Sequence, residues 1–391
     1  MKIGLNGDTS NPGENVIDKS VGGTSHIRPS CPDICTIQVA LILALEAGDK
    51  IGIYLQTNAP YLDLAHSTSF TIKYLIPTEP LPFGFSMRLK EPITVNVYGD
   101  KQIIGWRTND KGQYIRDSGS GKDEYLIGKP GLYLVAVNIE FLDVEGITKA
   151  IPSLNNIPAL SATYKAPKEE SFTISVSGIM DIQAGSVFTV IVFTESDQFY
   201  KVSDKSTSSV TYIGETKVVP GFTATRNVEM LLSFQPNQWT SIDRWSTSGK
   251  DFLFENGQGF DSKMSYIVQE SGFYYCSINV ILSSLNNATS KMELALVHNN
   301  INNFFNGLYA TSVLAKQGTI TLQVSGGIYL SKWDFLVVKV KSSEILVDVA
   351  LEQESTFSIL KLGIKSTSIN YLDELLGVQL TFLSFNKGSK S

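Results

Sequence analysis

The sequence predicts an all-β protein made of repeated sandwich modules, and three observations support this prediction. The composition is 42% hydrophobic and 10% aromatic but only 18% charged, which favours packed strands over disorder or long solvated helices. The strand-like segments are short, alternate in polarity and are separated by turns rich in Gly, Asn, Asp and Ser. Local patterns also recur in the same order every 140 residues or so. Since 391 residues exceed what one hydrophobic core usually serves, we expect several modules.

The clearest repeated element is a strand that opens with Gly and an aromatic residue. The segment GLYLVAVNIEF begins at Gly131, and its counterpart GFYYCSINVIL begins 141 residues later (272 − 131). Three positions are identical between the two segments: Gly131 with Gly272, Tyr133 with Tyr274, and Asn138 with Asn279. The match predicts the same strand in two successive modules.

Three further elements recur in the same order. A strand, a tight turn and another strand appear in three segments: LEAGDKIGI, IQAGSVFTV and LSKWDFLVV. Their alignment matches Gly48, Gly185 and Trp333. The next residues, Asp49, Ser186 and Asp334, stand at the turn. Opening strands are expected at Gly84, Gly221 and Gly377. Closing strands rich in β-branched and aromatic residues begin at Thr68, Ser208 and Ser355, with Val210 standing where Phe70 and Phe357 stand.

Proline-bearing connectors divide the chain, because proline cannot continue a central strand. Such connectors occupy residues 76–82 and 217–221. We therefore expect complete modules at residues 79–218 and 219–368, and the later half of a module at residues 1–78. Residues 369–391 would form the opening strand of a further module or an exchange tail, with a short helix expected at residues 369–377.

In this order the elements resemble the C1q/TNF superfamily over nearly the whole chain. The resemblance includes a Trp region that precedes each Gly-x-Tyr strand, at Trp106 and Trp245. It implies tandem jelly rolls in which aromatic residues line either the inner core or a trimer axis; the candidates are Phe70, Trp106, Tyr133, Trp245, Tyr274 and Phe357. The sequence departs from the pattern at Ser186, Trp333 and Val210, and it does not distinguish the C1q branch from the TNF branch.

The resemblance also implies a calcium interpretation of two turn residues. Asp49 and Asp334 stand at turns where some members of the C1q branch bind calcium. Calcium needs several oxygen ligands, and an aspartate that stabilises its own turn is the alternative. We expect no other cofactor.

Catalytic patterns are missing from the sequence. The three histidines, His26, His66 and His298, have no Ser, Cys or carboxylate at a spacing typical of a nucleophile and its base. The string DSGSGKDE at residues 117–124 lacks the first Gly and the Ser or Thr of a phosphate-binding loop, so we interpret it as a solvated turn. The sequence predicts a protein that is not an enzyme.

Cysteines and one sequon bear on the compartment. Cys31 and Cys35 would close a small disulfide loop in a secreted protein or would be free thiols otherwise, and the sequence leaves both open. Cys276 lies opposite Val135 of the preceding repeat, which predicts a small buried hydrophobe. Asn287 begins an Asn-Ala-Thr glycosylation sequon between two expected strands and favours secretion.

Charge and length restrict the partners. The net charge of −6 gives no electrostatic footprint for nucleic acid or an anionic membrane, and no apolar run is long enough to span a bilayer. Two functions stay open. One is a secreted structural protein that self-associates into fibres or extracellular matrix, by trimeric packing or by head-to-tail strand exchange between the two incomplete ends. The other is a trimeric recognition protein that binds carbohydrate, a microbial surface or a receptor.

Overall fold

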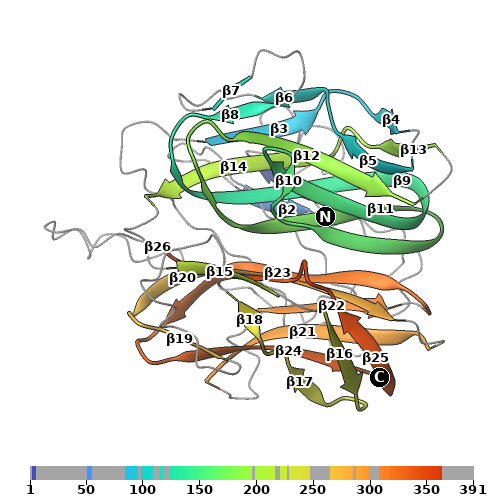
Figure 1. Cartoon of the computed structure of the whole chain (residues 1–391), viewed down its shortest axis with the longest axis vertical. Helices are drawn as coiled ribbons and strands as arrows, with labels where there is room; N and C mark the ends of the chain where they lie inside the picture. The colour runs from blue at the N-terminus through green and yellow to red at the C-terminus, as the bar shows by residue number, and fades with distance from the viewer. Residues whose placement is uncertain are drawn as a thin grey trace, which may run out of the picture.

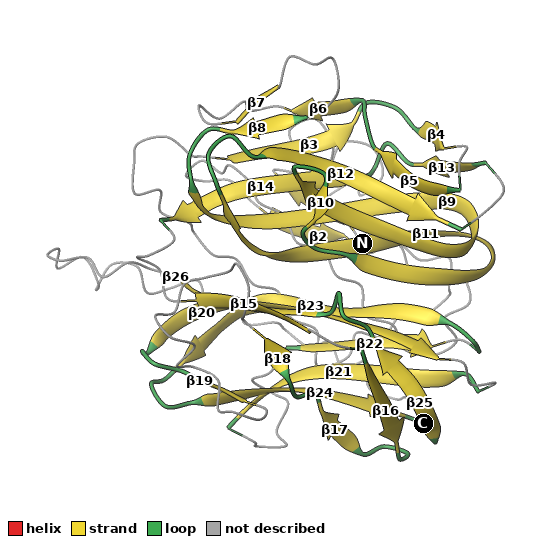
Figure 2. Cartoon of the chain, in the orientation of Figure 1, coloured by secondary structure: helices red, strands yellow, loops and turns green. Residues whose placement is uncertain are grey.

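The computed structural model of the chain describes residues 2–5, 51–54, 84–95, 98–108, 115–117, 124–195, 199–215, 221–226, 229–246, 265–284, 288–299, 308–314 and 316–362. These residues form antiparallel strands and no helix, as Figure 2 shows, which confirms the predicted all-β class. In this part of the chain we find no helix of the length and hydropathy that a membrane span requires. The helix expected at residues 369–377 falls outside the described residues.

Two jelly-roll sandwiches lie one above the other in Figure 1. The strands of the first sandwich are β3 (Gly84–Leu89), β4 (Ile93–Val95), β5 (Gly99–Gln102), β6 (Trp106–Thr108), β7 (Ile115–Asp117), β8 (Tyr125–Ile127), β9 (Gly131–Leu154), β10 (Ile157–Pro158), β11 (Ala162–Ile182), β12 (Val187–Thr194), β13 (Tyr200–Val202) and β14 (Thr207–Gly214). The strands of the second are β15 (Gly221–Arg226), β16 (Met230–Phe234), β17 (Trp239–Ser241), β18 (Trp245–Ser246), β19 (Ser265–Ile267), β20 (Gly272–Ser284), β21 (Ser290–His298), β22 (Tyr309–Leu314), β23 (Thr319–Leu330), β24 (Phe335–Ser342), β25 (Leu346–Leu351) and β26 (Thr356–Leu362).

The long strands β9 and β11 pass through both layers of the first sandwich. The start of β9 pairs with β14, and its end pairs with β12, while β11 follows it antiparallel along most of its length. Register shifts between Ala166 and Phe172 let β11 change layers. In the second sandwich β20 and β21 follow the path of β9, and β22 and β23 follow the path of β11. Because each long strand is divided in two, the second sandwich has separate seven-stranded and five-stranded sheets.

Strand pairings of the first sandwich recur in the second. In the first sandwich β3 pairs with β14 and β6, and in the second β15 pairs in the same way with β26 and β18. Likewise β12 pairs with β5 and β8, and β24 pairs with β17 and β19. Side-chain hydrogen bonds recur as well. Asn138 Nδ2 donates to Thr207 Oγ1 at 3.1 Å, and Asn279 Nδ2 donates to Thr356 Oγ1 at 2.8 Å. The boundaries at residues 78, 218 and 368 stay predictions.

The strand register corrects one expected correspondence. Val210 pairs with Phe85 on the opening strand of the first sandwich, and Ile359 pairs with Phe222 on that of the second. Val210 is therefore the counterpart of Ile359, and Phe357 has its counterpart two positions earlier, at Ser208. The alignment by residue type was wrong here because both closing strands alternate in polarity, so that a shift of two positions preserves the pattern.

A further pair of strands lies near the N-terminus. β1 (Lys2–Leu5) pairs antiparallel with β2 (Ile51–Tyr54). The same antiparallel arrangement joins β21 to β24 in the second sandwich. The expected module half at residues 1–78 is otherwise outside the described residues.

The core of each sandwich is built from the inward positions of alternating strands. In β20 the inward residues are Tyr274, Cys276, Ile278 and Val280, all of them buried. Cys276 is a free, fully buried thiol, in the position predicted for a small hydrophobe. On the opposite side of the same strand, Ser277 and Asn279 donate hydrogen bonds to Ser177 of the first sandwich.

Candidate assembly interface

One strand of the first sandwich lies across a sheet of the second. β11 contacts β23, β20, β26 and β15, which all belong to the seven-stranded sheet, and Figure 1 shows the two sandwiches meeting along this strand. The contact joins two different surfaces, because a sheet edge of one sandwich meets a sheet face of the other. We call this contact the β11 interface.

Ser177 on β11 is the centre of the polar contacts in the β11 interface. Its carbonyl oxygen accepts hydrogen bonds from Ser277 Oγ at 2.8 Å and from Asn279 Nδ2 at 2.9 Å. Its hydroxyl lies 3.0 Å from Ser277 Oγ and accepts from Gln323 Nε2 at 3.0 Å. Ser177, Ser277 and Asn279 are all buried. Since buried polar groups without partners are costly, these bonds favour one alignment of β11 on the second sandwich.

An apolar cluster continues the β11 interface. Ile179 on β11 groups with Leu132 on β9 and with Leu360 on β26, and all three side chains are buried. The partly buried side chains packed around them come from both sandwiches: Leu134, Ile213, Tyr275 and Leu362. Burial of apolar surface drives association, and the buried polar contacts beside this cluster define its register.

Hydrogen bonds beyond the centre satisfy the backbone of β11. Thr321 Oγ1 accepts from the Thr163 amide at 2.7 Å and donates to the Thr163 carbonyl at 2.9 Å. Thr223 Oγ1 donates to the Ile179 carbonyl at 2.8 Å. In the opposite direction, Lys165 Nζ of β11 donates to the backbone carbonyl of Gln317 in the second sandwich at 2.8 Å. An exposed strand edge is a site for further pairing, and these side chains cover the edge of β11.

The aromatic residues singled out from the sequence lie inside the sandwiches. Trp106, Tyr133, Tyr274 and Phe357 are buried members of the core, and Trp245 packs against it at 5.8 Å from the Phe357 ring centroid. The two tyrosines make the same bond, since Tyr133 Oη donates to the Lys129 carbonyl at 2.7 Å and Tyr274 Oη to the Glu270 carbonyl at 2.6 Å. Phe70 lies outside the described residues.

Asp334 lies in the turn between β23 and β24, and donors surround its carboxylate. Oδ1 accepts from Asn299 Nδ2 at 2.7 Å, while Oδ2 accepts from the Ser331 amide at 2.7 Å and lies 2.6 Å from His298 Nε2. Burial alone would raise the pKa of Asp334, but the hydrogen bonds from Asn299, Ser331 and His298 outweigh it and hold the pKa below its usual value.

These contacts give the Asp334 carboxylate the role of a turn stabiliser. Among the described residues we find no group of three or more His, Cys, Asp or Glu side chains arranged for a metal. Calcium binding at Asp334 stays a prediction. The other candidates, Asp49, Cys31, Cys35 and Asn287, lie outside the described residues, as do His26 and His66.

Sequence reasoning missed the pairing of His298 with Asp334. The two residues are 36 positions apart and meet because β21 and β24 are neighbours, with His298 opposite Leu336. The repeat relates β21 to the end of β9 and β24 to β12, and these strands pair in both sandwiches. The pairing places the end of β21 beside the turn before β24.

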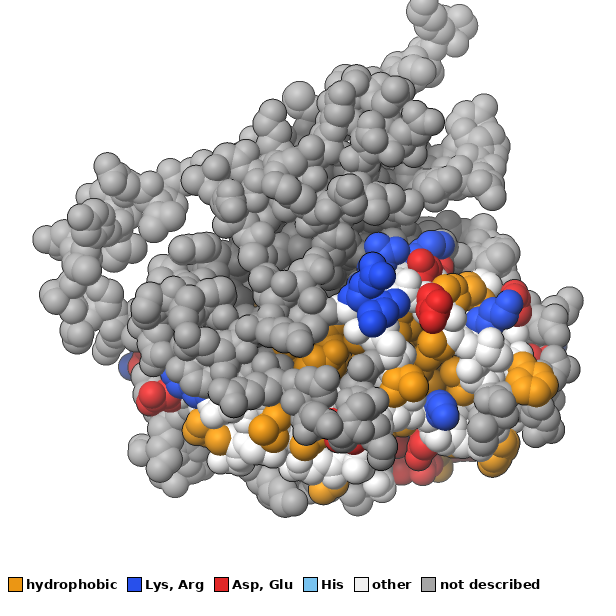
Figure 3. All heavy atoms as spheres, turned by 90° about the horizontal axis from the view of Figure 1, so that it is seen from above, with side chains coloured by type: hydrophobic (Ala, Val, Ile, Leu, Met, Phe, Trp, Pro, Cys, Tyr) orange, Lys and Arg blue, Asp and Glu red, His pale blue; other side chains and the backbone are white. Residues whose placement is uncertain are grey.

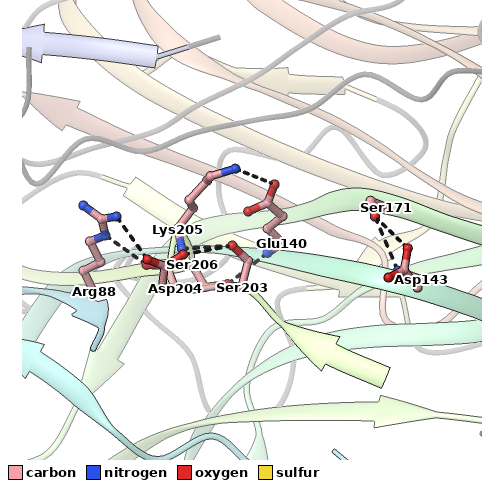
Figure 4. A network of polar contacts seen from close by, with 8 residues as sticks. All are labelled: Arg88, Glu140, Asp143, Ser171, Ser203, Asp204, Lys205 and Ser206. Atoms are coloured by element: carbon pink, nitrogen blue, oxygen red, sulfur yellow. Dashed lines mark hydrogen bonds and ion pairs between the residues drawn. The ribbon is translucent and has the colours of Figure 1, made fainter. Parts of the chain in front are cut away.

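A second polar network holds a turn of the first sandwich, as Figure 4 shows. Lys205 Nζ lies 3.6 Å from the buried carboxylate of Glu140, and the Glu140 amide donates to Ser206 Oγ at 3.0 Å. Arg88 Nε donates to the Asp204 carbonyl at 2.9 Å. These contacts fix the turn between β13 and β14 onto β9 and β3, and Ile281 occupies the position of Glu140 in the second sandwich.

Charges of both signs are mixed on the face drawn in Figure 3. Lys and Arg side chains lie next to Asp and Glu side chains, with hydrophobic side chains between them. The described residues on this face do not form a uniform field of one sign.

Comparisons with known proteins find similar solved structures over about a third of the chain. No family model matches the sequence, and no curated protein matches it. Among solved structures, the chain is similar to Eiger TNF from S. frugiperda, with 12% identity and a TM-score of 0.30 over 35% of this chain and 96% of that chain. It is also similar to murine APRIL at pH 5.0, with 12% identity and a TM-score of 0.28 over 34% of this chain and 98% of that chain. The fold itself defines a tandem jelly-roll β-sandwich protein.

Proposed function

We propose that this chain is a non-catalytic, secreted structural protein whose sandwiches self-associate into larger assemblies. The observation that carries the proposal is the β11 interface, in which a strand edge of one sandwich docks on the sheet face of another through the Ser177 hydrogen bonds. A contact between two different surfaces is heterologous, and it propagates until a rotation closes it into a ring.

One surface of this contact, the edge formed by β11, has a counterpart in the second sandwich. β23 is the counterpart of β11 in the second sandwich, and among the described strands it pairs with β20 alone, while its Thr321 and Gln323 side chains bond β11. Its residues Gly326, Gly327 and Ile328 are half-buried, whereas their counterparts Gly178, Ile179 and Met180 are buried. This difference supports β23 as the surface through which a further sandwich joins, within a trimer or along a filament.

Mass photometry and negative-stain microscopy of the purified chain test the proposal. We expect particles of more than one chain, either discrete trimers or filaments. Gly327→Arg, which adds a charged side chain to β23 opposite Tyr275, should shift the distribution towards single chains, while Ser233→Arg, at an exposed position of β16, should leave it unchanged. Wild-type protein that stays a single chain at micromolar concentration would disprove self-association. Circular dichroism should show the same strand content in all three proteins.

A further inference from the structure

The turn between β23 and β24 presents an exposed tryptophan in a conformation that disfavours it. Trp333 has a φ of 76° and is 66% exposed. The matching turn of the first sandwich has Gly185 at φ 85°, with open space around the position of a Cβ. Left-handed backbone is costly for a residue with a Cβ, and an exposed ring gains little packing in return.

Both turns have the same hydrogen bonds, so Trp333 occupies a glycine position in an unchanged frame. The Asp334 amide donates to the Ser331 carbonyl at 3.0 Å, as the Ser186 amide donates to Gln183 at 3.1 Å. The Trp333 amide donates to Val268 at 2.8 Å, as the Gly185 amide donates to Ile127 at 2.7 Å. The fold therefore does not require tryptophan here, and a residue retained against its local cost points to an interaction.

The turn is held in place before any ligand arrives. The Asp334 carboxylate binds His298, Asn299 and the Ser331 amide, as described above. The Lys332 amide donates to Ser271 Oγ at 2.8 Å, and Lys332 Nζ lies 4.8 Å from the Trp333 ring centroid. A pre-organised ring loses little entropy on binding.

Two more exposed aromatic rings lie at the same end of the second sandwich. Phe273 and Tyr329 are opposite one another on β20 and β23, are each more than half exposed, and have ring centroids 5.2 Å apart. Leu330 and then the turn follow Tyr329 along the chain. The Lys332 amide of this turn donates to Ser271 Oγ, just before the start of β20. The pair of rings is therefore joined to the Lys332–Trp333 turn through Leu330, and the same end also holds an ion pair between Lys361 Nζ and Glu270 Oε2 at 2.6 Å.

We propose that Lys332 and Trp333 form a binding site for acidic polysaccharide. The exposed indole stacks on the apolar C–H face of a sugar ring, as an amphipathic ring does at wet interfaces, and the Lys332 ammonium pairs with a carboxylate of the sugar. Phe273 and Tyr329 extend the platform to neighbouring sugars of the chain. An anionic membrane is disfavoured, because membrane recognition uses clusters of basic residues, whereas this site offers one ammonium group beside an exposed ring that can stack on a sugar.

Isothermal titration of the full chain with polygalacturonate, a polymer of uronic acid, tests the site. Dextran serves as the neutral polymer and phosphatidylserine vesicles as the membrane probe. We expect wild-type protein to bind polygalacturonate, and Trp333→Gly and Lys332→Ala each to weaken the binding at least about tenfold. Phe199→Ala, which removes an exposed ring from the first sandwich, should leave binding unchanged.

Thermal stability separates a binding role from a structural one. Trp333→Gly should raise the melting temperature by a few degrees while it removes binding, because glycine accepts the left-handed backbone. The proposal is overturned if wild-type protein does not bind polygalacturonate, if it binds vesicles instead, or if Trp333→Gly binds as wild type does. A lower melting temperature for Trp333→Gly would also contradict it, since tryptophan would then be serving the fold.

Discussion

The hydroxyl of Ser277 donates a hydrogen bond of 2.8 Å to the carbonyl of Ser177, which lies 100 positions earlier in the chain, in the other sandwich. Both side chains are buried, so this bond is made away from water. Ser277 occupies an outward position of a strand that the repeat predicts, and Ser177 an outward position of β11.

Ile179 and Leu360 should be coupled across the β11 interface. Each substitution to Ala removes buried apolar contacts and should lower the free energy of unfolding by about 2–5 kcal/mol. Since the two residues belong to one cluster, a double-mutant cycle in urea should give a coupling of about 0.5–3 kcal/mol. As a control, Ile179→Ala combined with Leu346→Ala, a core residue on β25, should be additive. Additivity in both cycles would show that the sandwiches do not dock in solution.

The Asp334 turn should make the second sandwich sensitive to acid. The folded-state pKa of Asp334 lies below its unfolded value of about 3.9, so its stabilising effect is fully present above that pH and is lost as the pH falls through the folded pKa. Urea unfolding should be measured in steps from about pH 6 to about pH 2.5, which spans the titration of the carboxylate. Over this range the free energy of unfolding should fall less for Asp334→Asn than for wild type. Equal losses in the two proteins would mean that the carboxylate contributes nothing.

Tyr133 and Tyr274 provide a matched pair for the strand-opening bond. Replacing either by Phe removes one hydrogen bond to a carbonyl four positions earlier and should cost about 1 kcal/mol. Burial, together with the charge of Glu270, raises the pKa of Tyr274 from 10.0 to about 12. The neutral form of Tyr274 therefore contributes to the free energy of unfolding below pH 10, and this contribution is lost as the pH rises through about 12. Denaturant titrations at neutral and alkaline pH measure both effects; an unchanged alkaline transition in Tyr274→Phe would contradict the assignment.

The repeat made much of the fold predictable. Aligning Gly131 with Gly272 matched Tyr133 with Tyr274 and Asn138 with Asn279, and each of these pairs makes the same hydrogen bond in its own sandwich. Such positions are readable because one strand must satisfy the same backbone and core in every module. The closing strand was less readable, since its alternation is preserved by a shift of two positions.

The interface was not predictable from the repeat, because it depends on differences between modules. Ser277, which binds Ser177, has Ala136 as its counterpart in the first sandwich. Ile179, which packs on Leu360, has Gly327 as its counterpart in the second. A single sequence contains no signal that a particular serine or isoleucine faces another sandwich. Trp333 was visible as a departure from the Gly pattern, but its exposure and its left-handed backbone appear only in the structure.

A cysteine cross-link between positions 177 and 277 tests the docking of the two sandwiches most directly. The hydroxyl oxygens of Ser177 and Ser277 are 3.0 Å apart, close enough for a disulfide between Ser177→Cys and Ser277→Cys in a background that carries Cys276→Val. After mild oxidation at low protein concentration, peptide mass spectrometry should find the two peptides joined within one chain. If both thiols stay free, or if the cross-link forms only between different chains, β11 does not lie on the second sandwich of its own chain.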